Sequence, residues 1–385
     1  MMARWKYIGG VMMVLTFSTV GINVFLLLIN SNDSMNPTTN QQRKSGDEDM
    51  RGPGITGLQQ GHSVHAEATA VSSANFLKPI SDMKDHQVRR KRALIEACTD
   101  LEFEEHPTRD HNLTLKELTS LKHTYVFDKH RILYCYVPKV SCTSWKHLFL
   151  VSYGAISPVR KRGEVKRSVH TEFDKVFKKI GQLPEDEANR KIKDYTQFLF
   201  VRNPFSRVLS AYREKIEFKD PEDPDEGYYS QFITRWLKKT NPGYLNQRNK
   251  TTPYSFQEFV RYFMARRVED EHWNDQYELC HPCLVEYDFI GKIETLHEDV
   301  HRFLGSVANG SSLVFPASDP QKHTWNSSND QTMTQYYWTI SDDDFISLIE
   351  CLYPDLRLFG YAIPIAIRRP RLRISRKYSL LVDVG

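Results

Sequence analysis

Glycine and proline are scarce in this sequence, since each supplies only 18 of its 385 residues. A collagen-like or low-complexity fibre needs far more of both and is therefore excluded. Hydrophobic residues make up 40% and aromatic residues 12% of the chain, which is more than a disordered chain carries. There is no internal repeat. The composition is that of a globular protein, and the length suits one large domain with accessory segments or two domains.

Cysteine is also sparse, and its pattern argues against one common kind of metal site. The pair Cys280-His-Pro-Cys283 has no second C-x-x-C to complete a four-cysteine zinc site, and no other metal-ligand cluster is evident. We therefore expect no metal and a structural disulfide, either within the pair or to other cysteines. Cys142 is interpreted as a packing or disulfide residue rather than a nucleophile.

Positive charge is absent between Lys6 and Arg43. Within this stretch, residues 7–29 form an apolar run of 23 residues, and about 20 suffice to span a bilayer. Arg4 and Lys6 precede the run, so the positive-inside rule predicts a cytoplasmic tail at 1–6 and a luminal remainder. A cleaved signal peptide fits less well, because its apolar region is usually about 7–15 residues long. We expect an uncleaved transmembrane signal anchor.

Asparagine-linked glycosylation sequons agree with a luminal body. The pattern N-x-[ST] occurs at Asn112, Asn249, Asn309 and Asn326. Single sequons arise often by chance, so their weight comes from this agreement with the anchor. An oxidising lumen would also permit disulfides.

A flexible stem is expected between the anchor and the domain, over residues 30–92. It is rich in Ser, Asn, Gln, Gly and Thr and ends in four basic residues at 89–92. That basic run fits either a protease site that would release the body or the solvated start of a helix, and we prefer the helix. The globular domain is expected at 93–367, with a basic tail at 368–385.

Short apolar segments then alternate with helical patterns. Strands are predicted at 131–137 and 197–201, and helices at 143–151, 204–218, 255–267, 294–304 and 342–352. Strands that alternate with helices indicate an α/β fold with a largely parallel central sheet flanked by helices.

The first of two candidate anion-binding segments runs from Tyr136 to Lys146, from a strand end through a tight loop into a helix. Amide groups and the dipole at a helix N-terminus favour an anion. Lys139 adds a positive charge, while Thr143 and Ser144 add hydroxyl donors. The signature G-x-x-x-x-G-K-[ST] is absent, which argues against a P-loop nucleoside triphosphatase.

The second segment, residues 200–213, repeats this order of strand end, loop and helix. Arg202 stands at the strand end, where its guanidinium can hold a phosphate bidentately. Ser210 follows about two helical turns later and would face the same anion if the chain curls back. Two such sites suit a ligand with two separated anionic groups.

These segments resemble the donor-binding motifs of Golgi carbohydrate sulfotransferases, the family that includes the chondroitin and dermatan 4-O-sulfotransferases and the HNK-1 epitope sulfotransferase. The pattern Y-V-P-K-V-x-C-T-x-W-K is matched at 136–146, and F-L-F-V-R-x-P-F-x-R-x-x-S-A-Y-R at 198–213. Further matches lie at 279–283, 287–296 and 358–361, so the resemblance covers about 90–363. The basic tail after Ile367 does not match the family pattern.

The resemblance implies a P-loop-like sulfotransferase domain that uses 3′-phosphoadenosine 5′-phosphosulfate (PAPS). Lys139 would stabilise charge on the bridging oxygen as the sulfuryl group leaves. Binding of the 5′ end is implied for Pro138, Lys139, Val140, Ser141, Cys142, Thr143 and Ser144. Binding of the 3′-phosphate is implied for Arg202, Asn203, Pro204, Phe205, Ser206, Arg207, Val208, Leu209 and Ser210.

The resemblance also implies a single-pass type II protein of the Golgi membrane that acts on a glycan. The expected acceptor is position 4 of N-acetylgalactosamine in chondroitin or dermatan. Alternatives are a terminal glucuronic acid, an N-glycan N-acetylgalactosamine, or a membrane-anchored glycan-binding protein without catalysis. No nucleic-acid partner is expected.

A base must accept the proton of the acceptor hydroxyl. His170 lies between the two anion segments, where related sulfotransferases often place their base. His272 is the rival, with Trp273 beside it as an aromatic suited to stacking on a sugar, and Glu172 is a further possibility.

The net charge of +4 conceals opposed regions of the chain. Residues 129–215, which hold both anion segments, carry 19 lysines and arginines against 8 acidic residues. Residues 216–367 carry 13 against 24. The basic region suits a polyanionic nucleotide and an anionic glycan beside it.

Overall fold

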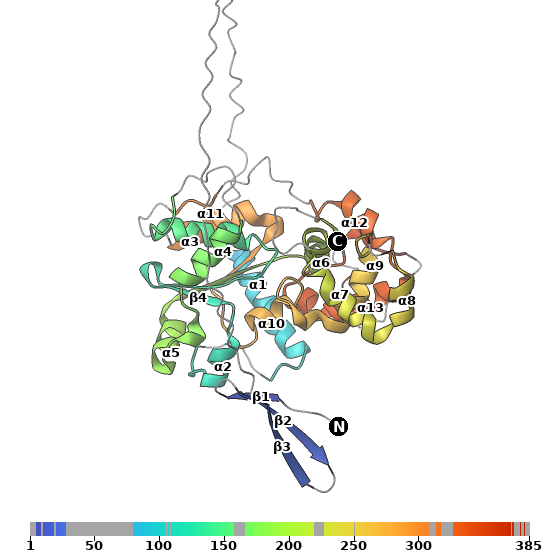
Figure 1. The fold of residues 1–385 in the computed structure, drawn as a ribbon. Coiled ribbons are helices and arrows are strands. Elements are labelled where there is room, and N and C mark those ends of the chain that lie inside the picture. Colours follow the sequence, from blue (N-terminus) through green and yellow to red (C-terminus); the bar gives the residue numbers. More distant parts are fainter. Residues whose placement is uncertain are drawn as a thin grey trace, which may run out of the picture. The chain divides into compact units, whose positions relative to one another are not determined.

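The computed structural model describes residues 5–8, 11–18, 21–27, 80–104, 107, 109–157, 166–218, 227–249, 251–307, 313–316, 326–370, 372, 378 and 381. The chain divides into two compact units, Met1–Ser72 and Ser73–Gly385 (Figure 1). Most of the predicted stem, most of the basic tail and the sequon at Asn309 lie outside the described residues.

The first unit contains three antiparallel strands, β1 (Trp5–Ile8), β2 (Val11–Ser18) and β3 (Gly21–Leu27). This differs from the helix predicted over 7–29. The segment is rich in β-branched and aromatic residues, which suit strands as well as an apolar helix, so periodicity alone does not separate the two. Among the described residues, no helix has both the length and the apolar character needed to cross a membrane.

The second unit is built on a four-stranded sheet of β4 (Thr124–Phe127), β5 (Ile132–Cys135), β6 (Thr196–Val201) and β7 (Phe289–Lys292), in that order. β4 is antiparallel to β5, whereas β5, β6 and β7 run parallel. The predicted α/β class with a largely parallel sheet is therefore confirmed. Because β5 and β6 are parallel neighbours, the loops that follow them leave the same edge of the sheet.

Helices follow each parallel strand. They are α3 (Cys142–Ser152) after β5, α6 (Pro204–Tyr212) after β6 and α11 (Leu296–Val307) after β7. α4 (Lys166–Val176) and α5 (Glu185–Asp194) complete the connection from β5 to β6. Beside the sheet lie α6, α7 (Ser230–Thr240), α8 (Pro242–Gln247), α9 (Phe256–Arg266), α12 (Asp330–Tyr337) and α13 (Asp342–Leu358) (Figure 1).

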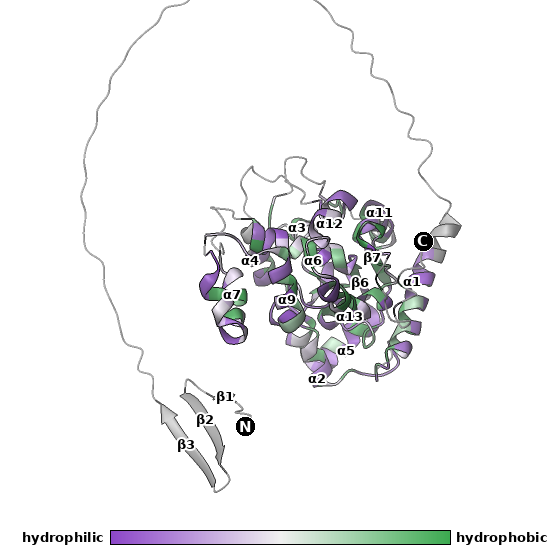
Figure 2. Ribbon diagram, turned by 90° about the vertical axis from the view of Figure 1, so that its right-hand side faces the viewer, coloured by the Kyte–Doolittle hydropathy of each residue, from purple (hydrophilic) through white to green (hydrophobic). Residues whose placement is uncertain are grey.

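The predicted helices are present with shifted ends. Ser255 begins α9 with a capping box to Glu258, and Ser341 begins α13 by accepting a hydrogen bond from the amide of Asp344. The prediction missed β4 and β7, which are only four residues long. α1 and α7 carry hydrophobic and hydrophilic residues in alternation, as expected for helices with one buried face (Figure 2).

The long helix α1 (Ile80–Asp100) begins inside the predicted stem. Gln87 bonds both the amide and the carbonyl of Ile290, at 3.0 and 3.1 Å, and so covers the free edge of β7. Arg90 donates to the Ile290 carbonyl and to Asp299, each at 2.8 Å. The basic run at 89–92 thus lies in the interior of a helix that packs on the sheet, not at a helix start.

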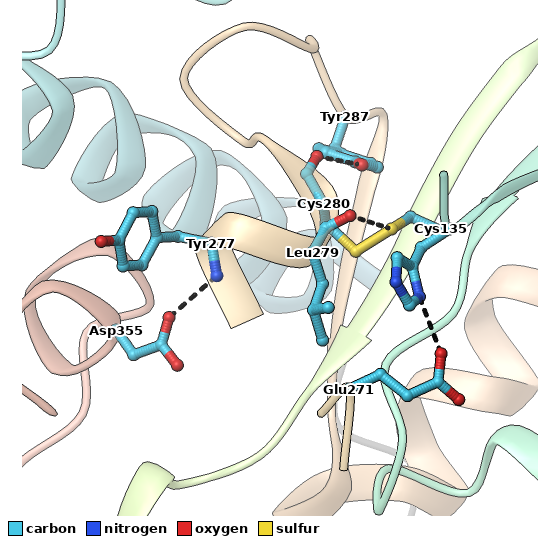
Figure 3. Close-up of a disulfide and its surroundings, with 8 residues drawn as sticks. Cys135, Glu271, Tyr277, Leu279, Cys280, Tyr287 and Asp355 are labelled. Atoms are coloured by element: carbon cyan, nitrogen blue, oxygen red, sulfur yellow. Dashed lines mark hydrogen bonds and ion pairs between the residues drawn. A yellow bond between two sulfur atoms is a disulfide. The ribbon is translucent and has the colours of Figure 1, made fainter. Parts of the chain in front are cut away.

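Two disulfides tie distant segments to the sheet. Cys135, at the end of β5, is bonded to Cys280 of α10 (Gln276–Cys280) (Figure 3). Cys98 of α1 is bonded to Cys283. The C-x-x-C pair is therefore bonded to other cysteines rather than within itself. Cys142 is a buried free thiol, and burial raises its pKa. This agrees with a packing role rather than a nucleophilic one.

Candidate functional site

The loop between β5 and α3 has an unusual backbone. Lys139 and Ser141 both have positive φ angles, of 70° and 54°, although neither is glycine. Such left-handed residues are strained and cluster at ligand-binding sites. Val140 between them is fully buried, which fixes the loop to the core. The Ser141 side chain makes no capping bond to α3, so the first-turn amides of that helix are not covered by this cap.

Lys139 connects the two predicted anion segments. Its carbonyl accepts a hydrogen bond from Arg202 Nη1 at 3.1 Å, so the loop after β5 touches the residue that ends β6. Its ammonium group forms an ion pair with Glu214, which follows α6. The two strand ends are thus close together, and an acidic partner that the sequence did not point to stands beside the lysine.

Arg202 is held in a fixed orientation by three side-chain bonds. Nε donates to Ser206 Oγ at 2.9 Å, Nη1 donates to the Lys139 carbonyl, and Nη2 donates to Ser328 Oγ at 2.9 Å. Gln276 bonds both its amide and its carbonyl, each at 2.9 Å. Burial lowers the pKa of the guanidinium to about 10, so it stays cationic at neutral pH.

The remaining residues of the second segment are a helix cap, two serines on one face of α6 and a set of apolar residues. Asn203 caps α6 by accepting from the amide of Phe205 at 3.0 Å, with Pro204 at the first turn. Ser206 and Ser210 are four residues apart and share one helix face. The apolar members are buried in the core, namely Phe205, Val208 and Leu209.

Arg207 is a buried residue that links two segments of the chain through its side chain. Its three guanidinium nitrogens donate to the carbonyls of Pro138, Asn274 and Glu271, at 3.0, 2.6 and 2.9 Å. It therefore joins the loop after β5 to the segment 271–274. All three of these side-chain contacts are to backbone oxygens of the protein.

His170 of α4 lies against the first segment. Its Nε2 is 3.2 Å from Thr143 Oγ1 and its Nδ1 is 3.2 Å from Lys146 Nζ. Because an ammonium group can only donate, Nδ1 accepts and Nε2 carries the proton that bonds Thr143. Burial, assisted by Lys146, lowers the pKa of His170 to about 4, so the ring is neutral near neutral pH.

In His272 the two ring nitrogens have the opposite roles to those in His170. Its Nδ1 is 2.7 Å from Asp270 Oδ1, so the carboxylate accepts the Nδ1 proton and Nε2 is left with its lone pair. Its ring lies 5.3 Å from that of Tyr229. Trp273 is only 1% exposed and packs in the core, so the predicted stacking of this tryptophan on a sugar is wrong. The third candidate base, Glu172, pairs with Lys175 at 2.8 Å.

A further group of ionisable residues adjoins the loop after β5. Tyr136 donates to Glu271 Oε2 at 2.6 Å, and His123 Nδ1 lies 3.8 Å from the same carboxylate. Lys146 Nζ stands 4.3 Å from the centre of the Tyr136 ring, and burial lowers its pKa. Burial also lowers the pKa of His123 to about 4.

Sequence reasoning missed Glu214, Ser328, Glu271 and Asp270. Asp270 and Glu271 carried a local signal, since they directly precede the candidate base His272. Of the four sequons, Asn112, Asn249 and Asn326 are exposed. Within the described residues, no three His, Cys, Asp or Glu side chains are grouped as metal ligands would be.

Comparison with known proteins gives one consistent result. The family model described as "Sulfotransferase family" matches residues 122–362. The chain is 31% identical over 311 residues to carbohydrate sulfotransferase 12 of Mus musculus, which covers 73% of this chain and 70% of that protein. It is 35% identical over 254 residues to carbohydrate sulfotransferase 14 of Danio rerio, which covers 65% of each chain. Carbohydrate sulfotransferase 11 of Rattus norvegicus is 34% identical over 63% of this chain and 68% of its own length. No solved structure matches significantly.

Proposed function

This chain belongs to the sulfotransferase family, and from that premise we propose that it transfers a sulfuryl group from PAPS to a hydroxyl of a glycan. The observation that carries the proposal is the bond from Arg202 Nη1 to the Lys139 carbonyl, which joins the two anion segments into one site. Relatives named carbohydrate sulfotransferases support the choice of a glycan acceptor.

The residues at this site fit a nucleotide with anionic groups at two ends. Lys139 and Thr143 supply donors at the end of β5, and Arg202 and Ser328 supply donors at the end of β6. PAPS would supply an activated sulfuryl group, whose transfer to an acceptor oxygen releases 3′,5′-adenosine bisphosphate and requires a base for the acceptor proton. The chain's own contribution is to position the reactants and stabilise developing charge.

We assign separate roles to the two segments. Lys139 neutralises charge that develops on the bridging oxygen, while Thr143 and the first amides of α3 bind the 5′ end. Arg202, with Ser210 and Ser328, binds the 3′-phosphate, and Ser206 orients Arg202 by accepting a hydrogen bond from its Nε. The apolar residues of α6 and Arg207 support that geometry without contacting the ligand.

We propose His272 as the general base, oriented by Asp270. Its Nε2 lone pair is available to an acceptor hydroxyl, and the carboxylate on Nδ1 stabilises the imidazolium that forms. The Nδ1 of His170 is already engaged by Lys146. His170 therefore acts as a positioning residue that orients the Thr143 hydroxyl. Should Lys146 move away, His170 would become the alternative base.

The proposed acceptor is position 4 of N-acetylgalactosamine in chondroitin or dermatan. The basic balance of residues 129–215 suits an acidic glycan. Terminal glucuronic acid or N-glycan N-acetylgalactosamine are the alternative acceptors. A glycan-binding protein without catalysis is the remaining alternative, and the intact Lys139, Arg202 and Ser210 argue against it.

For the location we propose the Golgi membrane, with the apolar segment 7–29 as anchor and the domain in the lumen. The support is the length of that segment and the basic residues before it. Glycosylation is proposed at the four sequons. Carbonate extraction and glycosidase sensitivity of the full chain test the anchor and the luminal orientation.

The decisive experiment is transfer of labelled sulfate to desulfated chondroitin, dermatan, heparan and N-glycan acceptors, with the product disaccharides mapped. Lys139→Ala and Arg202→Ala should each abolish transfer while the protein still folds. Binding of 3′,5′-adenosine bisphosphate distinguishes an enzyme from a lectin, which should bind none. Full activity in either variant would overturn the mechanism.

A further inference from the structure

The lysine proposed to act on the sulfuryl group is already paired with a carboxylate. Glu214 forms an ion pair with the Lys139 ammonium group, although the two residues are 75 positions apart. The Lys139 side chain is only 8% exposed and that of Glu214 is 25% exposed. Water therefore screens this pair less than it screens an ion pair at the surface.

The segment that carries Glu214 is anchored by contacts that do not involve Lys139. Glu214 lies in a π-helical segment, Arg213–Glu217, that continues α6, and single π turns are frequent at functional sites. Within this segment Arg213 Nε lies 3.7 Å from Glu217, and Glu217 accepts hydrogen bonds from Tyr336 at 2.7 and 2.8 Å. The segment thus has its own anchorage.

The backbone of Lys139 is constrained as well. Its positive φ and the bond from Arg202 to its carbonyl fix the main chain. Movement of the ammonium group must therefore come from the side-chain torsions. A ligand anion that binds the Lys139 ammonium group must either break its ion pair with Glu214 or lie close to the Glu214 carboxylate, which has the same charge as the ligand.

We propose that Glu214 is the resident counter-ion of Lys139: it holds the ammonium group at the donor site and competes with the donor's anionic end for it. This inference rests on the proposed function. Glu214 is a positioning residue, since it acts through Lys139. Its presence lowers affinity for the nucleotide and raises the fraction of Lys139 that is oriented for transfer.

The test is Glu214→Gln, with binding of 3′,5′-adenosine bisphosphate measured by calorimetry and sulfate transfer measured at saturating PAPS. Removal of the carboxylate charge should tighten nucleotide binding by about threefold or more, the scale of a partly buried charge interaction, and should lower kcat. Glu214→Asp, which keeps the charge, should bind the nucleotide nearly as the wild type does. Glu217→Gln, in the same π-helical segment, is the matched control and should not tighten binding.

If Glu214 had only a structural role, Glu214→Gln should weaken nucleotide binding instead of tightening it, because a damaged site binds its ligand more weakly. Unchanged or weaker nucleotide binding by Glu214→Gln, with the wild type binding normally, overturns the inference and leaves the proposed function intact. When Lys139 is already replaced by alanine, Glu214→Gln should change the nucleotide affinity less than it does in the wild type. An equal effect in both backgrounds would also overturn it. A wild type that binds no nucleotide would instead overturn the proposed function.

Discussion

Arg202, directly after β6, donates from Nη2 to the hydroxyl of Ser328, a residue 126 positions further along the chain, at 2.9 Å. Ser327 beside it is buried, and Asn329 caps α12 by accepting from the amide of Thr332 at 3.2 Å. Both neighbours of Ser328 are thus held in place. The hydroxyl is a preformed donor next to the guanidinium proposed to bind the 3′-phosphate.

Replacement of Ser328 should therefore weaken donor binding. We expect Ser328→Ala to raise the Kd for 3′,5′-adenosine bisphosphate about three- to tenfold, since one hydrogen bond contributes about 1 kcal/mol. Calorimetry on the purified protein measures this directly, and kcat at saturating PAPS should change little.

The controls for this prediction come from the sequon itself. Ser328 is also the hydroxyl residue of the sequon at Asn326, so Ser328→Ala removes any glycan there. Asn326→Gln removes the sequon but keeps the hydroxyl and should bind the nucleotide as the wild type does. If Asn326→Gln weakened binding as much as Ser328→Ala, the role assigned to the hydroxyl would be refuted.

The two candidate histidines should differ in which kinetic constant they change. Loss of a general base costs about 10²–10⁴ in rate, so His272→Gln should lower kcat by that order without changing nucleotide affinity. Asp270→Asn should lower kcat less, because it keeps the His272 ring and removes only the carboxylate that orients this ring and stabilises its protonated form. His170→Gln should chiefly raise KM for PAPS, because it releases the Thr143 hydroxyl. Single-turnover sulfate transfer separates these effects. The reverse pattern, with kcat lost in His170→Gln and kept in His272→Gln, would make His170 the base.

The buried neutral histidines should make stability depend on pH. Burial lowers the pKa of His123 and of His170 to about 4 in the folded protein, whereas a histidine in an unfolded chain titrates near 6.5. Between these values the unfolded chain binds more protons, so the stability present above about pH 6.5 is lost as the pH falls toward 4. The loss is at most about 3 kcal/mol for each residue.

His123→Gln and His170→Gln should flatten the dependence of Tm on pH in this range. His301→Gln, on the exposed side of α11, is the control, and an equal flattening by it would contradict the assignment.

Local patterns in the sequence predicted both anion segments but not the residues that complete them. Tyr136–Lys146 and Phe200–Arg213 each contain a strand end, a loop and a helix start, so their physics can be read from neighbouring positions. Glu214 and Ser328 acquire their roles from tertiary contacts over 75 and 126 positions. No periodicity or spacing encodes such contacts, and a glutamate or serine alone carries no distinctive signal.

The same reason explains what was missed in the fold. β7 has only four residues, too few for a clear strand pattern, and it is stabilised by pairing with β6 and by Gln87 of α1. The first half of α1 has a polar, charged sequence that looks like a stem, and the helix is stabilised by packing of its buried face on the domain. The choice between His170 and His272 depends on hydrogen-bond partners, which a linear sequence does not display.

The basic run at 89–92 offers a matched pair of substitutions for testing where the domain begins. Arg90 pairs at 2.8 Å with Asp299, whose side chain is fully buried, whereas Arg92 is 80% exposed and pairs with Glu96 on the surface of the same helix. A buried carboxylate that loses its partner costs about 3–5 kcal/mol, and a surface ion pair contributes about 0–1 kcal/mol. Arg90→Gln should therefore lower the free energy of unfolding by about 3 kcal/mol, and Arg92→Gln by less than about 1 kcal/mol. Chemical denaturation of the two variants measures both values. Equal values would mean that the part of α1 before residue 93 does not contribute to the stability of the domain, and that the boundary expected at residue 93 is correct. The expected difference instead makes α1 part of the folded domain, so a protease that cut at 89–92 would remove a structural helix rather than a linker.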